Sequence, residues 1–517
     1  MAVCGVNFMQ KESHTNTILI VGGGLSGALL ATRLLNAGRP LRVIVVEPRP
    51  QLGPGLAYST ACPRHLMNVP SGKLSLVDDD PKHFVNWLRA NHDARAADYS
   101  FAPRLVYGRY VTALLEAAWD QACTGARFEH VRSEAIALDK DGSQICLCLR
   151  DGSTIKADAA VLALGNPPSS EEVMPAIKDS PLRSSPCCFR SVWQPGAVSS
   201  LDPNAPVLLV GSGLTAVDAA ITLYEGGHRG LIHVVSRRGL LPRSHSPCPL
   251  PNNGGWKLEA SASLRELCAR VRERIRLVAS KGEDWRSVID GLRSITPQLW
   301  QRLPLTERRR FLRHLRPFWD VHRHRMAPEV AAFVDGRVQE QRLKVHAGRI
   351  RTIQQTSKGV QVEISLRGSS GELALAVRRV INCTGPECDY RKWPSPFWKN
   401  FFAQGMAQAG PMGLGLLTTE NGELINTEGE VVKNVFTLGP ARIGRDWETT
   451  AAPEIRVQSA ALATRLLSAA CVARERTGVA IVPIGPHAAL APRESPLTRG
   501  TAYDNETGGP IGKINLP

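Results

Sequence analysis

Two glycine-rich turns, 189 residues apart, constrain the fold of this chain more than any other feature of its sequence. Residues 22–27 are Gly-Gly-Gly-Leu-Ser-Gly, and residues 211–216 are Gly-Ser-Gly-Leu-Thr-Ala. Each turn follows a short aliphatic run typical of a buried strand and precedes a segment typical of a helix. A chain that repeats this strand–turn–helix pattern is predicted to form two doubly wound α/β units.

The first turn has the surroundings of a dinucleotide-binding fingerprint. A strand over Thr17–Val21 precedes it, a helix over 28–37 that closes at Gly38 follows it, and a second strand over 41–46 ends at Glu47. In such a unit the first glycine permits a tight turn, the second lets a pyrophosphate approach the backbone, and the third brings helix and strand together. The start of the helix also offers free N–H groups and a positive dipole end to phosphates.

The acid at the end of the second strand indicates which nucleotide binds here. Glu47 lies twenty residues after Gly27, where a carboxylate accepts hydrogen bonds from an adenosine ribose. That chemistry suits the adenosine part of FAD. We therefore predict that FAD contacts these residues of the first unit: Gly22, Gly24, Ser26, Gly27 and Glu47.

The second turn repeats the pattern with a different strand end. A strand over 206–210, a helix over 217–224 and a strand over 231–235 surround it, and Ser236-Arg237-Arg238 then replaces the acid. A carboxylate here would repel a 2′-phosphate, whereas arginines can pair with it, which favours NADPH over NADH. The alternative is that the arginines form a solvated strand end. The predicted NADPH contacts are Gly211, Gly213, Ala216, Ser236, Arg237 and Arg238.

Three further strands end in a glycine, at Gly165, Gly385 and Gly439. Glycine suits places where the chain crosses close beside a cofactor, although each could also be an ordinary turn. We predict cofactor contacts at Gly165 and Gly439. The resulting layout has an FAD-binding domain in two parts, 17–195 and 387–480. It also has an NADPH-binding domain over 196–386 with a helical insertion at about 258–335, and tails at 1–16 and 481–517.

Several local segments carry a more specific resemblance, over about residues 17–470: Gly53–Tyr58, His65–Gly72, Val235–Gly239, Leu241–Arg243 and Trp447–Arg456. Together with the paired fingerprints they resemble the flavoproteins with two dinucleotide-binding domains, in the group of FAD-dependent urate hydroxylases and aspartate N-monooxygenases. The resemblance implies a single-component monooxygenase in which NADPH reduces FAD. The flavin then hydroxylates a small, polar, nitrogen-containing substrate with molecular oxygen, through a flavin hydroperoxide.

Two other functions remain open at this point. One is a flavin-dependent reductase that passes electrons from NADPH to a quinone or a protein. The other is a redox-sensing flavoprotein that binds both cofactors without turnover.

The long loop Gly53–Gly72 is a candidate wall of the flavin site, because a loop of this length in a compact domain usually has a function. We expect His65 and Asn68 to contact the flavin ring; the alternative is that they only fasten the loop. Trp447, shortly before a predicted helix start at Pro453, could form a wall of the flavin or substrate site, with core packing as the alternative. These three residues are the catalytic candidates.

The remaining composition excludes several classes. The charge of +16 comes with no aromatic-interleaved basic motif, so we expect no nucleic-acid partner. No apolar run is long enough for a membrane span, so we expect none. No third ligand accompanies His322 and His324, so we expect no metal. Twelve scattered cysteines indicate a reducing, cytoplasmic setting, and Cys383-x4-Cys388 is badly placed for a redox pair. A homo-oligomer is compatible with the sequence.

The stretch 302–325 is the most basic part of the chain, with eight arginines against two acids. Helical spacing would put Arg309, Arg313 and Arg316 on one face, as a solvated surface. The alternative is that Arg323 or Arg325 meets the phosphates of the nicotinamide cofactor or an anionic substrate.

Overall fold

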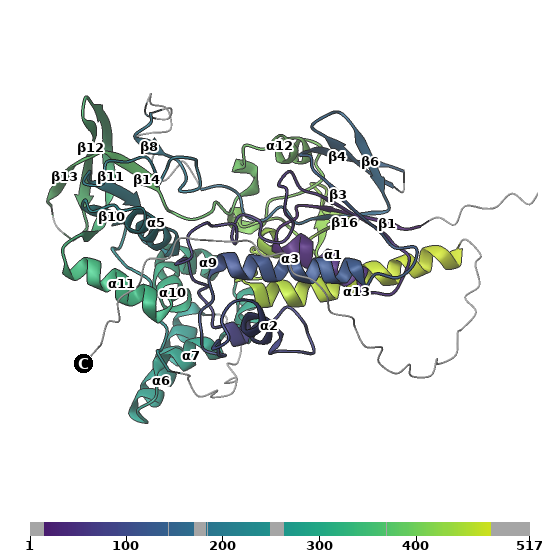
Figure 1. Ribbon diagram of the computed structural model, residues 1–517, viewed down its shortest axis with the longest axis horizontal. Coiled ribbons are helices and arrows are strands. Elements are labelled where there is room, and N and C mark those ends of the chain that lie inside the picture. Colours follow the sequence, from purple (N-terminus) through teal and green to yellow (C-terminus); the bar gives the residue numbers. More distant parts are fainter. Residues whose placement is uncertain are drawn as a thin grey trace, which may run out of the picture. The chain divides into compact units, whose positions relative to one another are not determined.

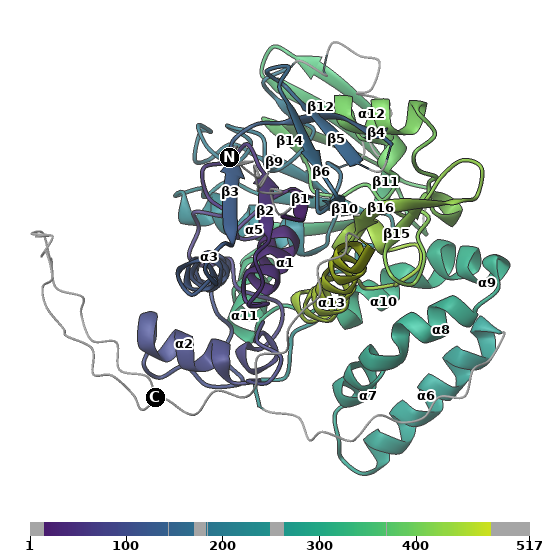
Figure 2. The same ribbon diagram turned by 90° about the vertical axis from the view of Figure 1, so that its right-hand side faces the viewer.

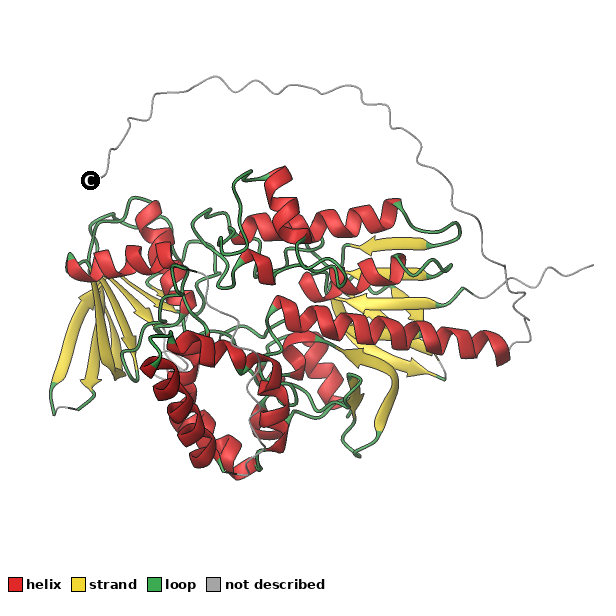
Figure 3. Cartoon of the chain, turned by 90° about the horizontal axis from the view of Figure 1, so that it is seen from below, coloured by secondary structure: helices red, strands yellow, loops and turns green. Residues whose placement is uncertain are grey.

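Two sheets with parallel strands at their centres organise the chain. The computed structural model describes residues 15–142, 144–169, 182, 185–248, 263–368 and 370–476, with side chains up to residue 469. The predicted tails, 1–16 and 481–517, lie outside this description except for Thr15 and Asn16, and so does the start of the predicted insertion, 258–262. In Figure 3 the strands fall into separate groups, each with helices beside it.

The first sheet contains the strand that precedes the first glycine turn. Its order is β15-β16-β7-β1-β2-β3, and every pair is parallel except β15 with β16. All five residues of β1 are buried, as expected for a parallel strand covered on both faces. The strands are β1 Thr17–Val21, β2 Arg42–Val46, β3 Arg127–Val131, β7 Ala159–Leu162, β15 Glu423–Ile425 and β16 Val431–Thr437.

Helices cover one face of this sheet, and a small antiparallel sheet covers the other. Alternate residues of β1 and β2 share one core with α1, α2, α3 and α13, and α1 lies alongside α13 (Figures 1 and 2). The intervening residues share a second core with β4–β6 and α12. The bounds are α1 Leu25–Leu35, α2 His83–Asn91, α3 Arg104–Asp120, α12 Pro396–Ala403, α13 Ala452–Arg476, β4 Ala135–Asp141, β5 Gln144–Leu149 and β6 Thr154–Ala157.

The second sheet has the order β13-β12-β11-β10-β9-β14-β8. Strands β8, β14, β9, β10 and β11 pair in parallel, whereas β11, β12 and β13 form an antiparallel extension. Helix α5 packs on this sheet, and α11 packs on α5. The bounds are β8 Cys188–Phe189, β9 Val207–Val210, β10 Ile232–Ser236, β11 Leu343–Thr356, β12 Gly359–Leu366, β13 Glu372–Val377, β14 Arg379–Asn382, α5 Leu214–Glu225 and α11 Pro328–Gln339.

Strand β8 belongs to this second sheet although it precedes residue 196, where we drew the boundary between the predicted domains. A strand of two residues carries no periodic signal, so the sequence pattern could not assign it.

The part of the predicted insertion, about 258–335, that the structure describes is helical, and it follows β10 in the chain and extends into α11. Before α11 it contains α6 Leu264–Ser280, α7 Trp285–Gly291, α8 Thr296–Arg302, α9 Leu305–Arg310 and α10 Arg316–Arg323. A π-helical turn, Phe311–Leu315, separates α9 from α10. This turn interrupts the regular helical spacing that predicted a single face for Arg309, Arg313 and Arg316.

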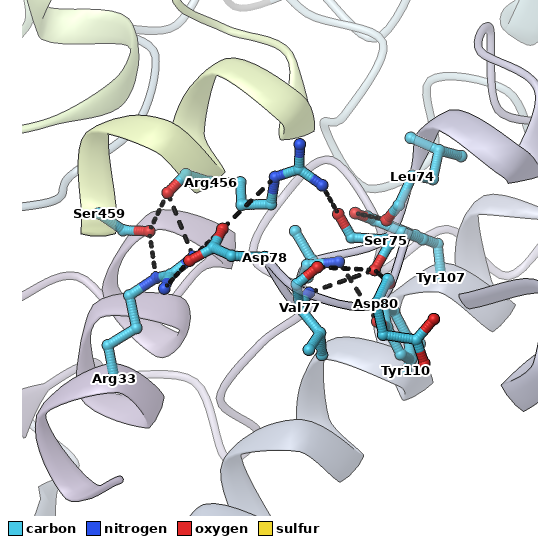
Figure 4. A network of polar contacts seen from close by, with 11 residues as sticks. Arg33, Leu74, Ser75, Val77, Asp78, Asp80, Tyr107, Tyr110, Arg456 and Ser459 are labelled. Carbon is cyan, nitrogen blue, oxygen red and sulfur yellow. Dashed lines mark hydrogen bonds and ion pairs between the residues drawn. The ribbon is translucent and has the colours of Figure 1, made fainter. Parts of the chain in front are cut away.

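A polar network joins the two long helices of the first unit to the loop after residue 73 (Figure 4). Arg33 of α1 forms a two-pronged ion pair with Asp78, at 2.6 and 3.0 Å, and donates to Ser459 of α13 at 3.0 Å. Arg456 of α13 donates to the backbone oxygen of Ser75 at 3.0 Å. The loop is therefore fixed against α1 and α13 before any ligand binds.

Candidate functional site

The first glycine turn is shaped partly by the protein's own packing. Gly22 has φ +105°, and a Cβ there would lie 2.4 Å from the carbonyl oxygen of Ala163 in the neighbouring strand connection. A Cβ on Gly27 would lie 1.9 Å from the carbonyl oxygen of Gly22. Gly24 is different, because it precedes α1 with negative φ and a Cβ there would meet nothing closer than Gly55 Cα at 3.4 Å. The fold requires Gly22 and Gly27, whereas a Cβ on Gly24 would make only an ordinary van der Waals contact.

Glu47 is buried just after β2, and its carboxylate is hydrogen-bonded to this turn. One carboxylate oxygen accepts from the backbone N–H of Gly23 at 2.9 Å, and the other accepts from that of Arg49 at 3.1 Å. Each oxygen of a carboxylate has two lone pairs, so both retain capacity for a ribose hydroxyl. The predicted ribose contact thus has a second, structural role.

Gly439 and Ser26 lie together where the chain returns to the first sheet. Gly439 has φ +74°, and a Cβ there would lie 2.7 Å from Ser26 Oγ. Gln458 accepts from the N–H of Gly439 at 2.8 Å, and Thr449 donates to its carbonyl oxygen at 3.1 Å. Gly165 also has positive φ, and its carbonyl oxygen accepts from Tyr390 at 2.6 Å. The predicted glycines of this unit therefore follow β1, β7 and β16, three strands of one sheet.

The second glycine turn has the same division of roles. Gly211 has φ +108°, and a Cβ there would lie 2.5 Å from the carbonyl oxygen of Cys383. A Cβ on Gly213, just before α5, would meet no protein atom within 4 Å. Ala216 is buried with its methyl group accommodated, where the first unit has Gly27.

The residues at the end of β10 differ in what they already contact. Ser236 accepts from Ser212 at 2.8 Å and from the N–H of Gly239 at 3.0 Å. Arg238 lies over the ring of Phe318 at 4.8 Å and donates to the carbonyl oxygen of His314 at 3.3 Å. Arg237 is exposed. Of the two predicted phosphate-binding arginines, Arg237 is the one whose side chain is the more available.

His65 lies between the two dinucleotide-binding units rather than in an open site. It is buried, and its Nε2 donates to the carbonyl oxygen of Asp218 at 2.9 Å, with Thr222 Oγ1 also at 2.9 Å. Its Nδ1 therefore accepts, from Thr60 Oγ1 at 2.7 Å. An ion pair of 2.5 Å between Arg104 and Asp218 lies beside it. These contacts favour the interpretation in which His65 fastens the loop, and burial lowers its pKa.

Asn68 follows on the same loop and contacts the second unit through its backbone. Its carbonyl oxygen accepts from His245 Nε2 at 3.0 Å, and burial lowers the pKa of His245 to about 4. Lys73 lies further along, near charges of the insertion that include Asp290 and Arg325, and its side chain remains exposed. Partial desolvation lowers the pKa of this lysine. No local sequence pattern predicts this charged cluster, because its members come from distant segments.

The arginines that could have met phosphates have carboxylate partners. Arg323 pairs with Glu448 at 2.8 Å, both side chains being nearly inaccessible, and the buried Arg325 pairs with Asp290. Trp319 donates to the other oxygen of Glu448 at 2.8 Å. Burial raises the pKa of Glu448, and Arg323 opposes that shift. The phosphate interpretation is therefore not supported for these two arginines.

Trp447, the third catalytic candidate, is buried in an aromatic cluster. Its ring stacks on that of Trp300 at 4.7 Å and meets the edge of Phe311 at 5.5 Å. It also forms part of the wall of a cavity of about 460 Å³ enclosed by the insertion. Trp447 therefore connects the return segment after Gly439 with α8 and with the π-helical turn Phe311–Leu315.

Metal and dithiol chemistry find no support in the described part of the chain. No group of three potential metal ligands occurs there. Cys383 and Cys388 are both free thiols, and burial raises the pKa of each. No helix within the described ranges is long and apolar enough to cross a lipid bilayer.

Comparison with known proteins agrees with this geometry. Residues 19–167 match the family described as FAD-NAD(P)-binding. Solved structures with the same fold include reduced ornithine hydroxylase from Pseudomonas aeruginosa, with 14% identity over 88% of this chain and 99% of that chain, at a TM-score of 0.60. Ornithine N-hydroxylase from Kutzneria sp. 744 shares 13% identity over 88% and 100%, at a TM-score of 0.59. Cadaverine monooxygenase from Erwinia amylovora shares 13% identity over 94% and 100%, at a TM-score of 0.58.

A search among curated proteins finds no match. The structural comparisons confirm the predicted fold class, an α/β flavoprotein fold with two dinucleotide-binding domains, and the family match confirms an FAD/NAD(P)-binding domain in the first part of the chain.

Proposed function

We propose that this chain is an FAD- and NADPH-dependent monooxygenase that hydroxylates a small nitrogen-containing substrate with molecular oxygen. The observation that carries the proposal is the shape of the two turns at Gly24 and Gly213, each at the N-terminus of a helix. A Cβ would meet no protein atom within 4 Å at Gly213, and at Gly24 it would meet only Gly55 Cα, at 3.4 Å. A helix start with room beside its backbone is suited to a phosphate. Two such places, one followed by the buried Glu47 and the other by the exposed Arg237, suit two different dinucleotides.

The amine preference rests on the structural neighbours. Those compared above are named as ornithine and cadaverine hydroxylating enzymes, and a further one is a lysine 6-monooxygenase from Pseudomonas syringae with 16% identity. A likeness at this identity is one of fold, so a primary amine is the first substrate class to test. The free cysteines of the described residues support a cytoplasmic location as part of the proposal.

The residues of this chain would divide the work as follows. The backbone at Gly24 and at Gly213 would receive the pyrophosphates, Glu47 the adenosine ribose of FAD, and Arg237 the 2′-phosphate of NADPH. Bound FAD supplies the hydride acceptor and the reaction with oxygen. Asn68, Lys73 and the return segment after Gly439 would orient the substrate and exclude water.

The test measures cofactor content and electron balance in the purified protein. We expect a yellow protein that oxidises NADPH faster than NADH. With ornithine, lysine, cadaverine or aspartate added in turn, the correct substrate should couple one oxygen consumed to one NADPH oxidised. Isotopically labelled oxygen should then appear in a hydroxylated product.

Two outcomes would contradict the proposal. A protein that cannot be reconstituted with FAD would refute it entirely. Electron transfer to an added quinone that outpaces transfer to oxygen, with no labelled product, would instead support the reductase alternative.

A further inference from the structure

The insertion encloses an apolar cavity that the proposed cofactor contacts leave unused. Its volume of about 460 Å³ lies within the range of small-molecule sites, roughly 300–1,000 Å³. Its lining side chains come mainly from α6, α7, α8, the turn Phe311–Leu315 and α10, with Trp447 added from the return segment. Four tryptophans line it: Trp285, Trp300, Trp319 and Trp447.

The cavity still exposes apolar side chains to water. Phe318 in its wall is 42% exposed, and Val271 and Ile275 of α6 are only partly buried. Covering such surfaces with an apolar ligand is favourable, because it removes them from water. Aromatic walls of this kind suit an alkyl chain or a flat ring.

The charges around the cavity select the sign of the ligand. Among the described lining residues there is no aspartate or glutamate, whereas Arg272 is present. Helix α6 carries five arginines against two glutamates. Two more guanidinium groups lie over lining tryptophans, Arg308 at 5.3 Å from Trp300 and Arg316 at 5.6 Å from Trp447. Two carboxylates also lie nearby: Asp320 pairs with Arg316 at 3.4 Å, and Glu448 accepts from the lining Trp319 at 2.8 Å. Because both carboxylates have arginine partners, the exposed Arg272 sets the charge at the cavity wall and would attract an anion rather than an ammonium group.

We infer that the cavity binds the apolar body of an amphipathic carboxylate, with the carboxylate held near Arg272. None of residues 22–27 or 211–216 lines the cavity, so the inference goes beyond the proposed function and does not depend on it. Arg238, a predicted NADPH contact, lies over Phe318 in the cavity wall. Trp447 precedes Glu448 and Thr449, and Thr449 holds the carbonyl oxygen of Gly439. Occupation of the cavity therefore reaches the return segment of the FAD-binding unit.

The test is a titration of the flavin-loaded protein with decanoate, with decanol and decylamine as neutral and cationic probes of matched length. Binding is followed by tryptophan fluorescence and by calorimetry. We expect saturable binding of decanoate that perturbs the fluorescence. Decanol should bind about fivefold more weakly, as an exposed ion pair is worth up to about 1 kcal/mol, and decylamine more weakly still.

Three substitutions on α6 locate the site. Val271→Trp fills the cavity and should weaken decanoate binding by at least about tenfold in calorimetry, because a ring replaces the space for the ligand. Leu277→Trp is the matched control, since Leu277 lies on the same helix and is 45% exposed, and it should bind as the wild type does. Arg272→Glu changes only an exposed side chain and should reverse the preference, so that decylamine binds more tightly than decanoate.

Three results would overturn the inference: no saturable binding of decanoate to the wild type, unchanged binding in folded Val271→Trp, or equal affinity for the three probes. Flavin content and NADPH oxidation without a probe are recorded on the same samples. They report on the proposed function separately, so failure of one claim is distinguishable from failure of the other.

Discussion

Glycine-to-alanine substitutions in the two turns can separate glycines that the packing of the fold requires from glycines that leave room for a ligand. At Gly27 an added Cβ would lie 1.9 Å from the carbonyl oxygen of Gly22, so α1 would have to move away from β1. Alanine gains about 1 kcal/mol over glycine in helix propensity, but overpacking of a core costs about 1–3 kcal/mol. A clash with rigid backbone belongs at the top of that range. We expect Gly27→Ala to lower the free energy of unfolding by about 2 kcal/mol net.

Gly213→Ala is the informative counterpart. It adds a methyl group where no protein atom lies within 4 Å, at a residue with negative φ. Because alanine is a poorer N-cap than glycine, the free energy of unfolding should fall by about 1 kcal/mol or less, which is smaller than the loss for Gly27→Ala. If a phosphate occupies that space, the methyl group displaces it from the helix N-terminus. Loss of a charge-assisted hydrogen bond costs about 1.5–3 kcal/mol, which corresponds to a rise in KM for NADPH of about 10- to 100-fold.

The assay combines urea unfolding with steady-state NADPH oxidation for both variants, and Gly24→Ala provides the same comparison for bound FAD. The two variants should show opposite patterns: Gly27→Ala should lower the free energy of unfolding, whereas Gly213→Ala should mainly lower the affinity for NADPH. A Gly213→Ala protein with the KM of the wild type would refute the assignment of this turn to a phosphate. A Gly213→Ala protein as unstable as Gly27→Ala would refute the geometric argument itself.

Three further predictions follow from single contacts. Arg237→Ala should raise KM for NADPH about tenfold and leave KM for NADH unchanged. Arg238→Ala should raise KM for NADPH by less, because the Arg238 side chain already stacks on Phe318. Steady-state kinetics with both nucleotides measures the two effects. Glu448→Ala leaves the guanidinium of Arg323 buried without its partner and should cost about 3–5 kcal/mol in urea unfolding, while an unchanged midpoint would contradict the contact. Burial lowers the pKa of His245 to about 4, below its unfolded value near 6.5. The free energy of unfolding that neutral His245 contributes is therefore present above pH 6.5 and falls by up to about 1.4 kcal/mol per pH unit as the pH drops toward 4. His245→Gln should flatten this slope when unfolding is measured across that pH range.

The sequence predicted best what depends on neighbouring residues. Gly22, Gly27 and Gly211 are required by turn geometry and close packing, which a local pattern reports directly. The helices begin earlier than predicted, at Leu25 and Leu214, because the glycines before them serve as N-caps and the rest of each motif is already helical.

What the sequence could not predict depends on pairs of distant residues. His65 contacts Thr222, 157 positions away, and Trp447 stacks on Trp300. Lys73 lies among charges of the insertion, and nothing in its own segment indicates them. In each case either residue alone is compatible with a loop or a core position, and only the tertiary fold brings the partners together.

The attachment of the insertion has a consequence for motion. By chain order it belongs to the NADPH-binding unit, yet side chains also join it to the return segment of the other unit. These contacts are Arg323 with Glu448, Arg293 with Glu454 in a two-pronged pair at 2.6 Å, and Trp300 with Trp447. If the NADPH-binding unit rotates to admit or release its nucleotide, the insertion cannot travel with it without breaking buried ion pairs.

Such a rotation would break the His65 contacts to α5. The wall around the apolar cavity would then stay attached to the return segment of the FAD-binding unit while the nucleotide enters and leaves. The NADPH-binding unit would thus move while the helical insertion stays with the FAD-binding unit, although the residues of the insertion lie within the NADPH-binding unit in the sequence.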